Sequence, residues 1–154
     1  MVPAAISRQH MEEELDGVRD LTQTYGWVVT PDLENLKVTF KLRSQVDAEE
    51  YVIEFTCDDY KAKPPYVEFI EPGTDARGTP RAYPRDKKGY VHQQGPCICA
   101  PFSRKSYTQE GGPHSGWEFG NWMSQDPAHG TIGEIVLLVQ RLIDSPETYS
   151  GRFV

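Results

Sequence analysis

No apolar run in the 154-residue chain approaches the ~20 residues that a membrane-spanning helix requires. The first residues, Met1 to Ile6, lack the basic start and the long apolar stretch of a secretory signal, which predicts a cytoplasmic protein. Positive charge is also in deficit, because 16 Lys and Arg face 23 Asp and Glu and leave a net charge of −7. Such a charge repels phosphate backbones and anionic lipid head groups, so we expect neither nucleic acid nor a membrane as a partner.

Cysteine is scarce and odd in number, since the chain holds only Cys57, Cys97 and Cys99. In a reducing cytosol, thiols are more often buried, metal-binding or catalytic than paired in disulfides. Cys57 lies on the apolar face of a predicted strand and is most simply a small core residue. The closely spaced pair Cys97 and Cys99 requires a separate explanation.

Helical periodicity appears first near the N-terminus. Between Ser7 and Tyr25, apolar residues recur at spacings of four and three, and Gly26 ends the expected helix. The acidic run Glu12 to Glu14 lies in its first half, where carboxylates suit the positive helix end, and we expect it to form a solvated face.

Period-two alternation of β-branched and aromatic residues then predicts a series of strands. Proline and polar residues separate them and supply the turns. The chain is therefore expected to be an α+β protein with a four-stranded antiparallel meander behind its N-terminal helix. The expected strands are Trp27 to Thr30, Lys37 to Leu42, Tyr51 to Cys57 and Tyr66 to Ile70.

The segment Glu71 to Tyr90 is rich in glycine, proline and charge and has no periodicity. It is therefore expected to be a surface loop, and loops of this length in a compact domain are more often functional than incidental. Helical order returns from Thr131 to Asp144, and Pro146 ends it. We expect one domain over residues 1–154, in which residues 147–154 form a tail.

The stretch between these parts, Tyr90 to Pro101, contains the thiol pair in a Gly- and Pro-rich setting that predicts an irregular backbone. A cysteine in such a loop can stay accessible, and the nearby Arg104 and Lys105 are expected to favour its thiolate, because positive neighbours lower a thiol pKa.

Three interpretations of Cys97 and Cys99 remain open on the residues alone. They could be two structural thiols in a tight loop. They could bind zinc together with His92 and His114, although common zinc modules place two or more residues between paired cysteines. One of them could instead be a nucleophile assisted by a histidine or an amide.

Three segments in this order resemble ubiquitin-conjugating enzymes. Asp59 to Phe69, DYKAKPPYVEF, resembles the family's YPFKPPKVRF stretch that leads into the fourth strand. Ile98-Cys99-Ala100 lies where the family has its ICL active-site cysteine. Thr131 to Glu147, TIGEIVLLVQRLIDSPE, resembles the family's TI..VLLSIQSLL..PNP helix. With the order of helix, antiparallel strands, double proline, cysteine loop and helix, the resemblance extends over roughly residues 10 to 147 and implies a ubiquitin-conjugating-type fold.

The resemblance implies that Cys99, rather than Cys97, accepts a ubiquitin-like protein as a thioester. The donor would be an activating-enzyme-like adenylyltransferase, the final acceptor an amine of a protein, and no cofactor is expected. The family's His-Pro-Asn triplet is replaced here by His92-Gln93-Gln94, so the Gln94 amide becomes the candidate oxyanion donor. His114, and after it His92, are the candidates for proton handling.

By this resemblance, the chain is expected to lack the last two helices of eukaryotic members and to have a longer loop before the cysteine. This plan, with Gly112-Pro113-His114 before Trp117, resembles prokaryotic ubiquitin-conjugating-like proteins. Their genes typically lie beside those of an activating enzyme, a ubiquitin-like protein and a metallopeptidase, and some of these clusters act in antiphage defence. The alternative is a catalytically silent module of the same fold that binds a ubiquitin-like protein.

Overall fold

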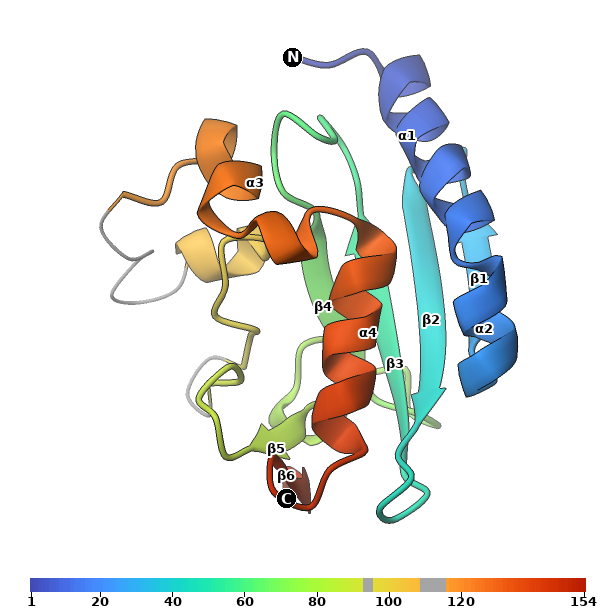
Figure 1. The fold of residues 1–154 in the computed structure, drawn as a ribbon, viewed down its shortest axis with the longest axis vertical. Coiled ribbons are helices and arrows are strands. Elements are labelled where there is room, and N and C mark those ends of the chain that lie inside the picture. The colour runs from blue at the N-terminus through green and yellow to red at the C-terminus, as the bar shows by residue number, and fades with distance from the viewer. Residues whose placement is uncertain (93–95, 109–115) are drawn as a thin grey trace.

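The computed structural model describes residues 1–92, 96–108 and 116–154. Helices α1 and α2, a four-stranded antiparallel sheet and helix α4 form its main body (Figure 1). Within the described ranges, none of the helices combines the length and apolar character of a membrane span. The α-helices are α1 (Ala4–Gly17), α2 (Arg19–Tyr25), α3 (Trp122–Gln125) and α4 (Ile132–Ile143). The strands are β1 (Val28–Asp32), β2 (Lys37–Arg43), β3 (Glu50–Thr56), β4 (Tyr66–Ile70), β5 (Pro84–Asp86) and β6 (Tyr149–Arg152). Short 3-10 helices are η1 (Pro80–Ala82), η2 (Arg104–Thr108), η3 (Phe119–Asn121) and η4 (Pro127–His129).

The main sheet has the order β1-β2-β3-β4, and each strand is antiparallel to the next, which confirms the predicted meander. Its register places Phe40 beside Ile53 and Ile53 beside Phe69, all fully buried. These side chains lie on one face of the sheet because residues paired directly across neighbouring strands point to the same face. Helix α4 lies across this face in Figure 1.

Helix α4 supplies the other half of the core. Thr131 caps its start, because its side-chain oxygen accepts a hydrogen bond from the Glu134 N–H. The end of α4 lies before Pro146, as the sequence predicts. Its apolar stripe is buried against the sheet. Gly133 permits a close approach to the N-terminal helices, because a Cβ there would lie 2.3 Å from a Val18 methyl carbon.

The predicted N-terminal helix is divided in two. It begins at Ala4 and ends at Gly26, which has the left-handed φ of 70° expected of a helix-ending glycine. Val18 interrupts it with φ −99° and ψ 6° and is buried in the core. The prediction of one uninterrupted helix over residues 7–25 was therefore wrong. The helix is interrupted where Val18 packs against α4, although the apolar spacing continues through this position.

Glu14 corrects the expectation of a fully solvated acidic face. Its Oε1 accepts hydrogen bonds from the Tyr60 hydroxyl at 2.8 Å and from the Ile132 N–H at 2.7 Å. Lys61 Nζ lies 3.1 Å from the other carboxylate oxygen, as an ion pair without hydrogen-bond alignment. Glu12 and Glu13 are exposed as predicted, whereas Glu14 joins α1 to the loop before β4 and to the start of α4.

The segment predicted as a surface loop and the segment predicted as a tail pair with each other. Strand β5 lies antiparallel to β6, and Tyr83 and Phe153 are buried in the core. Residues 149–152 are therefore a strand rather than a tail. The pairing was missed because both strands are short, have no apolar alternation and lie more than sixty residues apart in the chain.

Candidate active site

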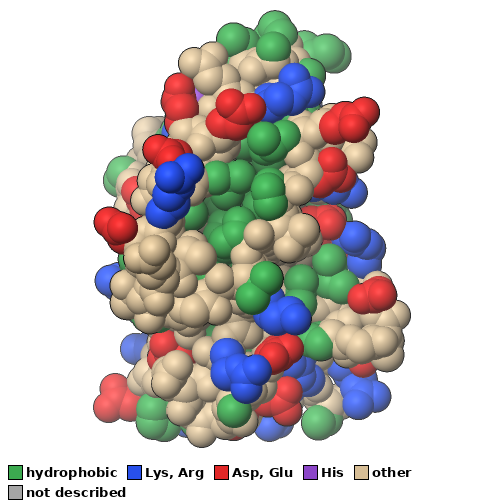
Figure 2. All heavy atoms as spheres, turned by 90° about the vertical axis from the view of Figure 1, so that its right-hand side faces the viewer, with side chains coloured by type: hydrophobic (Ala, Val, Ile, Leu, Met, Phe, Trp, Pro, Cys, Tyr) green, Lys and Arg blue, Asp and Glu red, His purple; other side chains and the backbone are tan. Residues whose placement is uncertain are grey.

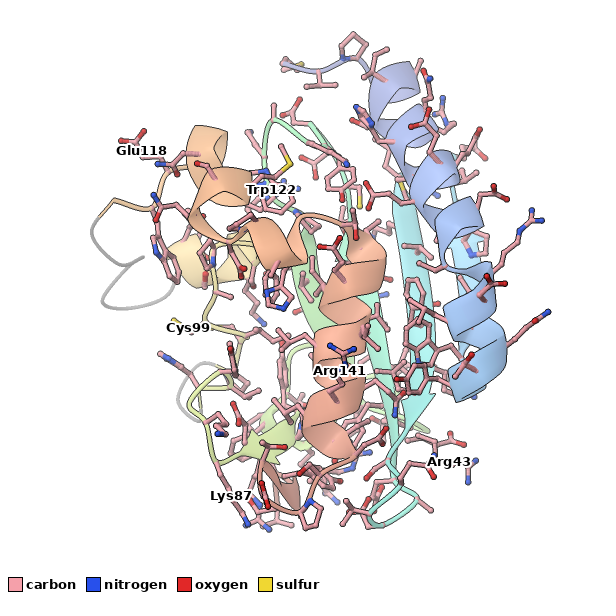
Figure 3. The ribbon with its side chains drawn as sticks, viewed as in Figure 1. Arg43, Lys87, Cys99, Glu118, Trp122 and Arg141 are labelled. Carbon is pink, nitrogen blue, oxygen red and sulfur yellow. The ribbon has the colours of Figure 1, made fainter. Side chains whose placement is uncertain are left out.

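Cys99 lies on a short antiparallel pairing between the two ends of a loop. The Cys99 N–H donates to the Tyr90 carbonyl at 2.6 Å, and the His92 N–H donates to the Cys97 carbonyl at 3.1 Å. Figure 3 shows Cys99 on the left of the molecule, across α4 from helices α1 and α2. Two backbone hydrogen bonds thus join residues 90–92 to residues 97–99.

Two buried side chains anchor this pairing to the core. Val91 and Ile98 face each other across it and are 7% and 3% exposed. A cavity of only about 10 Å³ behind them is lined by residues such as Phe69 and Leu142, so the packing there is tight. Successive residues of an extended segment point to opposite sides, so Cys99 points away from the side on which Ile98 packs. Cys97 lies on the same side as Cys99 and is nevertheless buried.

The three thiols differ in accessibility. Cys57 directly follows the end of β3 and is fully buried, which confirms the prediction that it is a core residue. Cys97 is 1% exposed, whereas Cys99 is partly exposed. Access is a condition for thiol chemistry with another protein. Of the three, Cys99 is the one that meets it.

The segment before the thiols is organised by one carboxylate. Asp86 accepts hydrogen bonds from the backbone N–H groups of Lys88 at 2.7 Å, Tyr90 at 2.5 Å and Val91 at 3.1 Å. Three backbone N–H groups that donate to one carboxylate fix the path of residues 86–91. Since the Tyr90 carbonyl in turn accepts from the Cys99 N–H, Asp86 positions the segment to which Cys99 is hydrogen-bonded.

The segment after the thiols is held by Arg104 of η2. Its guanidinium donates to the carbonyls of Pro64 and Thr56 and to the Asp58 carboxylate at 2.9 Å, while its backbone N–H donates to Pro65 at 3.0 Å. Five donors in a fixed fork suit a site where several acceptors converge. Arg104 thereby joins the post-cysteine turn to the double-proline loop.

Neither cation near the loop favours the Cys99 thiolate, so that expectation was wrong. Arg104 is engaged as described, and the Lys105 ammonium lies 3.3 Å from a Glu68 carboxylate oxygen. Burial raises the pKa of the Cys99 thiol above its ordinary value. Burial, with the neighbouring Cys99 thiolate, raises the pKa of Cys97 to about 11, although Lys105 opposes the shift. The thiol form of Cys99 therefore dominates at neutral pH.

Alkylation of Cys99 by iodoacetamide is expected to rise about tenfold per pH unit from pH 7 upward, because only the thiolate reacts and its pKa is raised. Cys97 should react far more slowly at each pH, since it is buried and has a pKa of about 11. Timed quenching followed by peptide mass mapping measures both rates. A rate for Cys99 that levels off below about pH 8 would contradict the raised pKa.

The other predicted site residues are only partly within the described chain. The backbone N–H of His92 is hydrogen-bonded to the Cys97 carbonyl, and the His92 side chain is exposed. Gln94 and His114 lie outside the described residues. Over the ranges that the structure describes, no three or more His, Cys, Asp or Glu side chains gather as a metal site would require.

His129 is a histidine near the thiol segment that sequence reasoning missed. Its Nδ1 lies 2.9 Å from both carboxylate oxygens of Asp126, and its ring contacts Phe102 edge-on, with 5.7 Å between centroids. Phe102 follows Cys99 by three residues. The only sequence signal was the three-residue spacing of Asp126 and His129, which is compatible with many surface turns.

Comparison with protein-family models gives no match, and comparison with curated proteins gives none either.

Proposed function

We propose that this protein has a ubiquitin-conjugating-type fold and carries a ubiquitin-like protein as a thioester on Cys99. The observation that supports the proposal most is that Cys99 is the partly exposed thiol in a loop braced from both sides, while Cys57 and Cys97 are buried. The order of elements supports it as well, since an N-terminal helix, an antiparallel meander, a double-proline loop and a cysteine loop precede α4.

In the first proposed step, the Cys99 thiolate attacks the thioester carbonyl carbon on an activating-enzyme-like adenylyltransferase. The bond from this carbon to the Cys99 sulfur forms, the bond to the donor's cysteine sulfur breaks, and the donor leaves as a thiolate. No oxidant is needed, because one thioester replaces another. The proton that Cys99 loses goes to solvent or to the departing thiolate.

In the second proposed step, an amine of a protein acceptor attacks the same carbonyl carbon. The carbon–nitrogen bond forms, the amine loses a proton, and the Cys99 thiolate leaves. A donor to the developing oxyanion would add about 3 kcal/mol of transition-state stabilisation, and Gln94 is proposed for that role. His114 is proposed first for accepting the proton, and His92 second.

The raised pKa of Cys99 suits a carrier of this kind. A thiol that is mostly protonated at neutral pH is protected from adventitious alkylation and oxidation, which act on the thiolate. Formation of the thioester then depends on a partner that accepts the proton or delivers the acyl group at close range. The proposal places the pathway in the bacterial cytoplasm, beside the genes of its activating enzyme and ubiquitin-like protein.

The test is reconstitution with the activating enzyme and the ubiquitin-like protein encoded beside its gene, together with ATP. Gels run without reductant should show an adduct of the two proteins, and reductant should remove it. If no adduct forms although the activating enzyme itself becomes charged, the catalytically silent binding module is the better description. Zinc bound stoichiometrically and lost on Cys97→Ala would instead support a metal site.

Asp86→Ala is expected to slow adduct formation about tenfold, because residues 86–91, which support Cys99, lose the acceptor of three backbone N–H groups. Asp86→Asn keeps one acceptor oxygen, and its charging rate should lie between those of Asp86→Ala and the wild type. Glu147→Ala, at an exposed acid, is the matched control. Initial rates of charging measure the effect, and equal rates for Asp86→Ala and Glu147→Ala would exclude this brace from the site.

A further inference from the structure

A groove runs between the N-terminal helices and β1, on the side of the molecule away from Cys99. Two adjoining hollows of about 290 Å³ and 370 Å³ share Leu15, Arg19 and Val29 as lining residues. Figure 2 shows this face, with a recess of hydrophobic side chains bordered by charged groups. Val18 lines one hollow and Leu33 the other, so aliphatic side chains line both.

The segment that forms the groove is acidic. Residues 4–35 contain seven Asp and Glu, of which Glu14 is engaged elsewhere with Tyr60 and Ile132, and two Lys and Arg. Glu12 and Asp16 line the groove itself, and both are exposed. Arg19 is paired with Asp16 at 3.0 Å, yet their side chains are 80% and 68% exposed, so the pair contributes little and can open to a partner.

The shape of the groove favours a helix over an added strand. Strand β1 is at the edge of the sheet, but Pro31 within it has no backbone N–H to donate, which makes the edge a poor template for strand addition. A groove with an aliphatic lining beside packed helices instead accepts the apolar side of an amphipathic helix. An acidic rim selects a helix whose other side chains are basic.

We infer that this groove is a docking site for a basic amphipathic helix of a partner protein. Leucine-like side chains of that helix occupy the hollows over Leu15 and Val29, and its Lys or Arg side chains pair with Glu12 and Asp16. The inference stands apart from the chemistry of Cys99, which lies on the other side of the molecule (Figure 3). A partner held in the groove therefore leaves the thiol accessible.

The probe is a fluorescein-labelled peptide of about 16 residues, with leucines at i, i+3, i+4 and i+7 and lysines elsewhere. A peptide of identical composition with its leucines dispersed around the helix is the control for charge alone. Fluorescence anisotropy with the full chain should give at least about tenfold tighter binding of the amphipathic peptide. Equal affinity for the two peptides would overturn the inference, because attraction would then be electrostatic only.

Paired charge reversals locate the site. E12K/D16K changes the groove rim on α1. E13K/D20K makes the same change in net charge on α1 and α2, at exposed residues that do not line either hollow. The first pair should weaken binding about tenfold or more and the second less than about threefold. Similar losses in both pairs would contradict the groove as the site.

Methyl NMR completes the test, since Leu15, Val18 and Val29 should shift on addition of the amphipathic peptide. Shifts confined to another face would overturn the assignment. Sedimentation of the chain alone distinguishes a second copy as the occupant, because a dimer that E12K/D16K disperses would show that the groove binds this protein itself. The thioester assay is not involved, so failure here leaves the proposal for Cys99 unaffected.

Discussion

In the charging reaction, Cys99→Ser is expected to form an adduct that survives reductant and is cleaved by hydroxide, and Cys99→Ala to form none. A serine oxygen at this position can accept the acyl group, but the resulting ester does not exchange with thiols. The yield for Cys99→Ser should be lower than for the wild type, because a hydroxyl is a weaker nucleophile than a thiolate. Gels run after treatment with reductant or with hydroxide distinguish the adducts of the wild type, Cys99→Ser and Cys99→Ala.

Cys97→Ala is the matched control for these variants. It removes a buried thiol two residues away and should retain a reductant-sensitive adduct. Each variant's thermal unfolding shows whether a loss reflects chemistry or folding. An adduct that persists in Cys99→Ala and disappears in Cys97→Ala would assign the acyl group to the other thiol.

Glu14→Ala is expected to lower the free energy of unfolding by about 3 kcal/mol, because it leaves a buried hydroxyl and a backbone N–H without their acceptor. The Lys61 ammonium also loses its counter-charge. For a domain of this size, such a loss lowers the melting temperature by about 10 °C. Urea unfolding followed by tryptophan fluorescence measures it.

Glu13→Ala is the control, since the neighbouring glutamate is exposed and accepts a hydrogen bond from the exposed Gln9 side chain. It should change stability by no more than about 0.5 kcal/mol. Glu14→Gln should lie between the two, because its amide oxygen still accepts a hydrogen bond. Equal effects of Glu13→Ala and Glu14→Ala would show that the carboxylate is not a structural link between α1 and α4.

Local patterns predicted the main elements well. The alternation that leads from Val38 to Leu42 places β2 within one residue, and β4 is found over the predicted Tyr66 to Ile70. The reason is that side chains on one face of a half-buried sheet must all be apolar, so the sequence repeats the geometry of the strand. The stripe of α4 follows from the same requirement at helical spacing.

Contacts between distant residues were not predictable in this way. Nothing in the run Glu12 to Glu14 distinguishes the carboxylate that meets Tyr60 and Ile132 from its solvated neighbours. Arg104 was expected to act on a thiolate, but it binds backbone carbonyls and Asp58 forty to fifty residues earlier in the chain. Such partners depend on the complete fold, because three-dimensional proximity leaves no local periodicity.

The candidate site shows the same division. The sequence distinguished Cys99 from Cys57 through the strand pattern, and from Cys97 through the resemblance of Ile98-Cys99-Ala100 to a family motif. The structure adds that Cys97 is buried and Cys99 partly exposed, a difference that alternation alone could not supply for two residues on the same side. It also identifies Asp86 as the residue that organises the supporting segment, residues 86–91.

The most direct test of Cys99 as the acyl carrier uses two variants that each keep one thiol of the loop. One combines Cys57→Ala and Cys97→Ala, and the other combines Cys57→Ala and Cys99→Ala. Each is charged with the activating enzyme, the ubiquitin-like protein and ATP, and the adduct is weighed by intact-protein mass spectrometry. We predict a reductant-sensitive adduct on the first variant and none on the second. An adduct on the second variant alone, or on neither while the wild type is charged, would contradict the account.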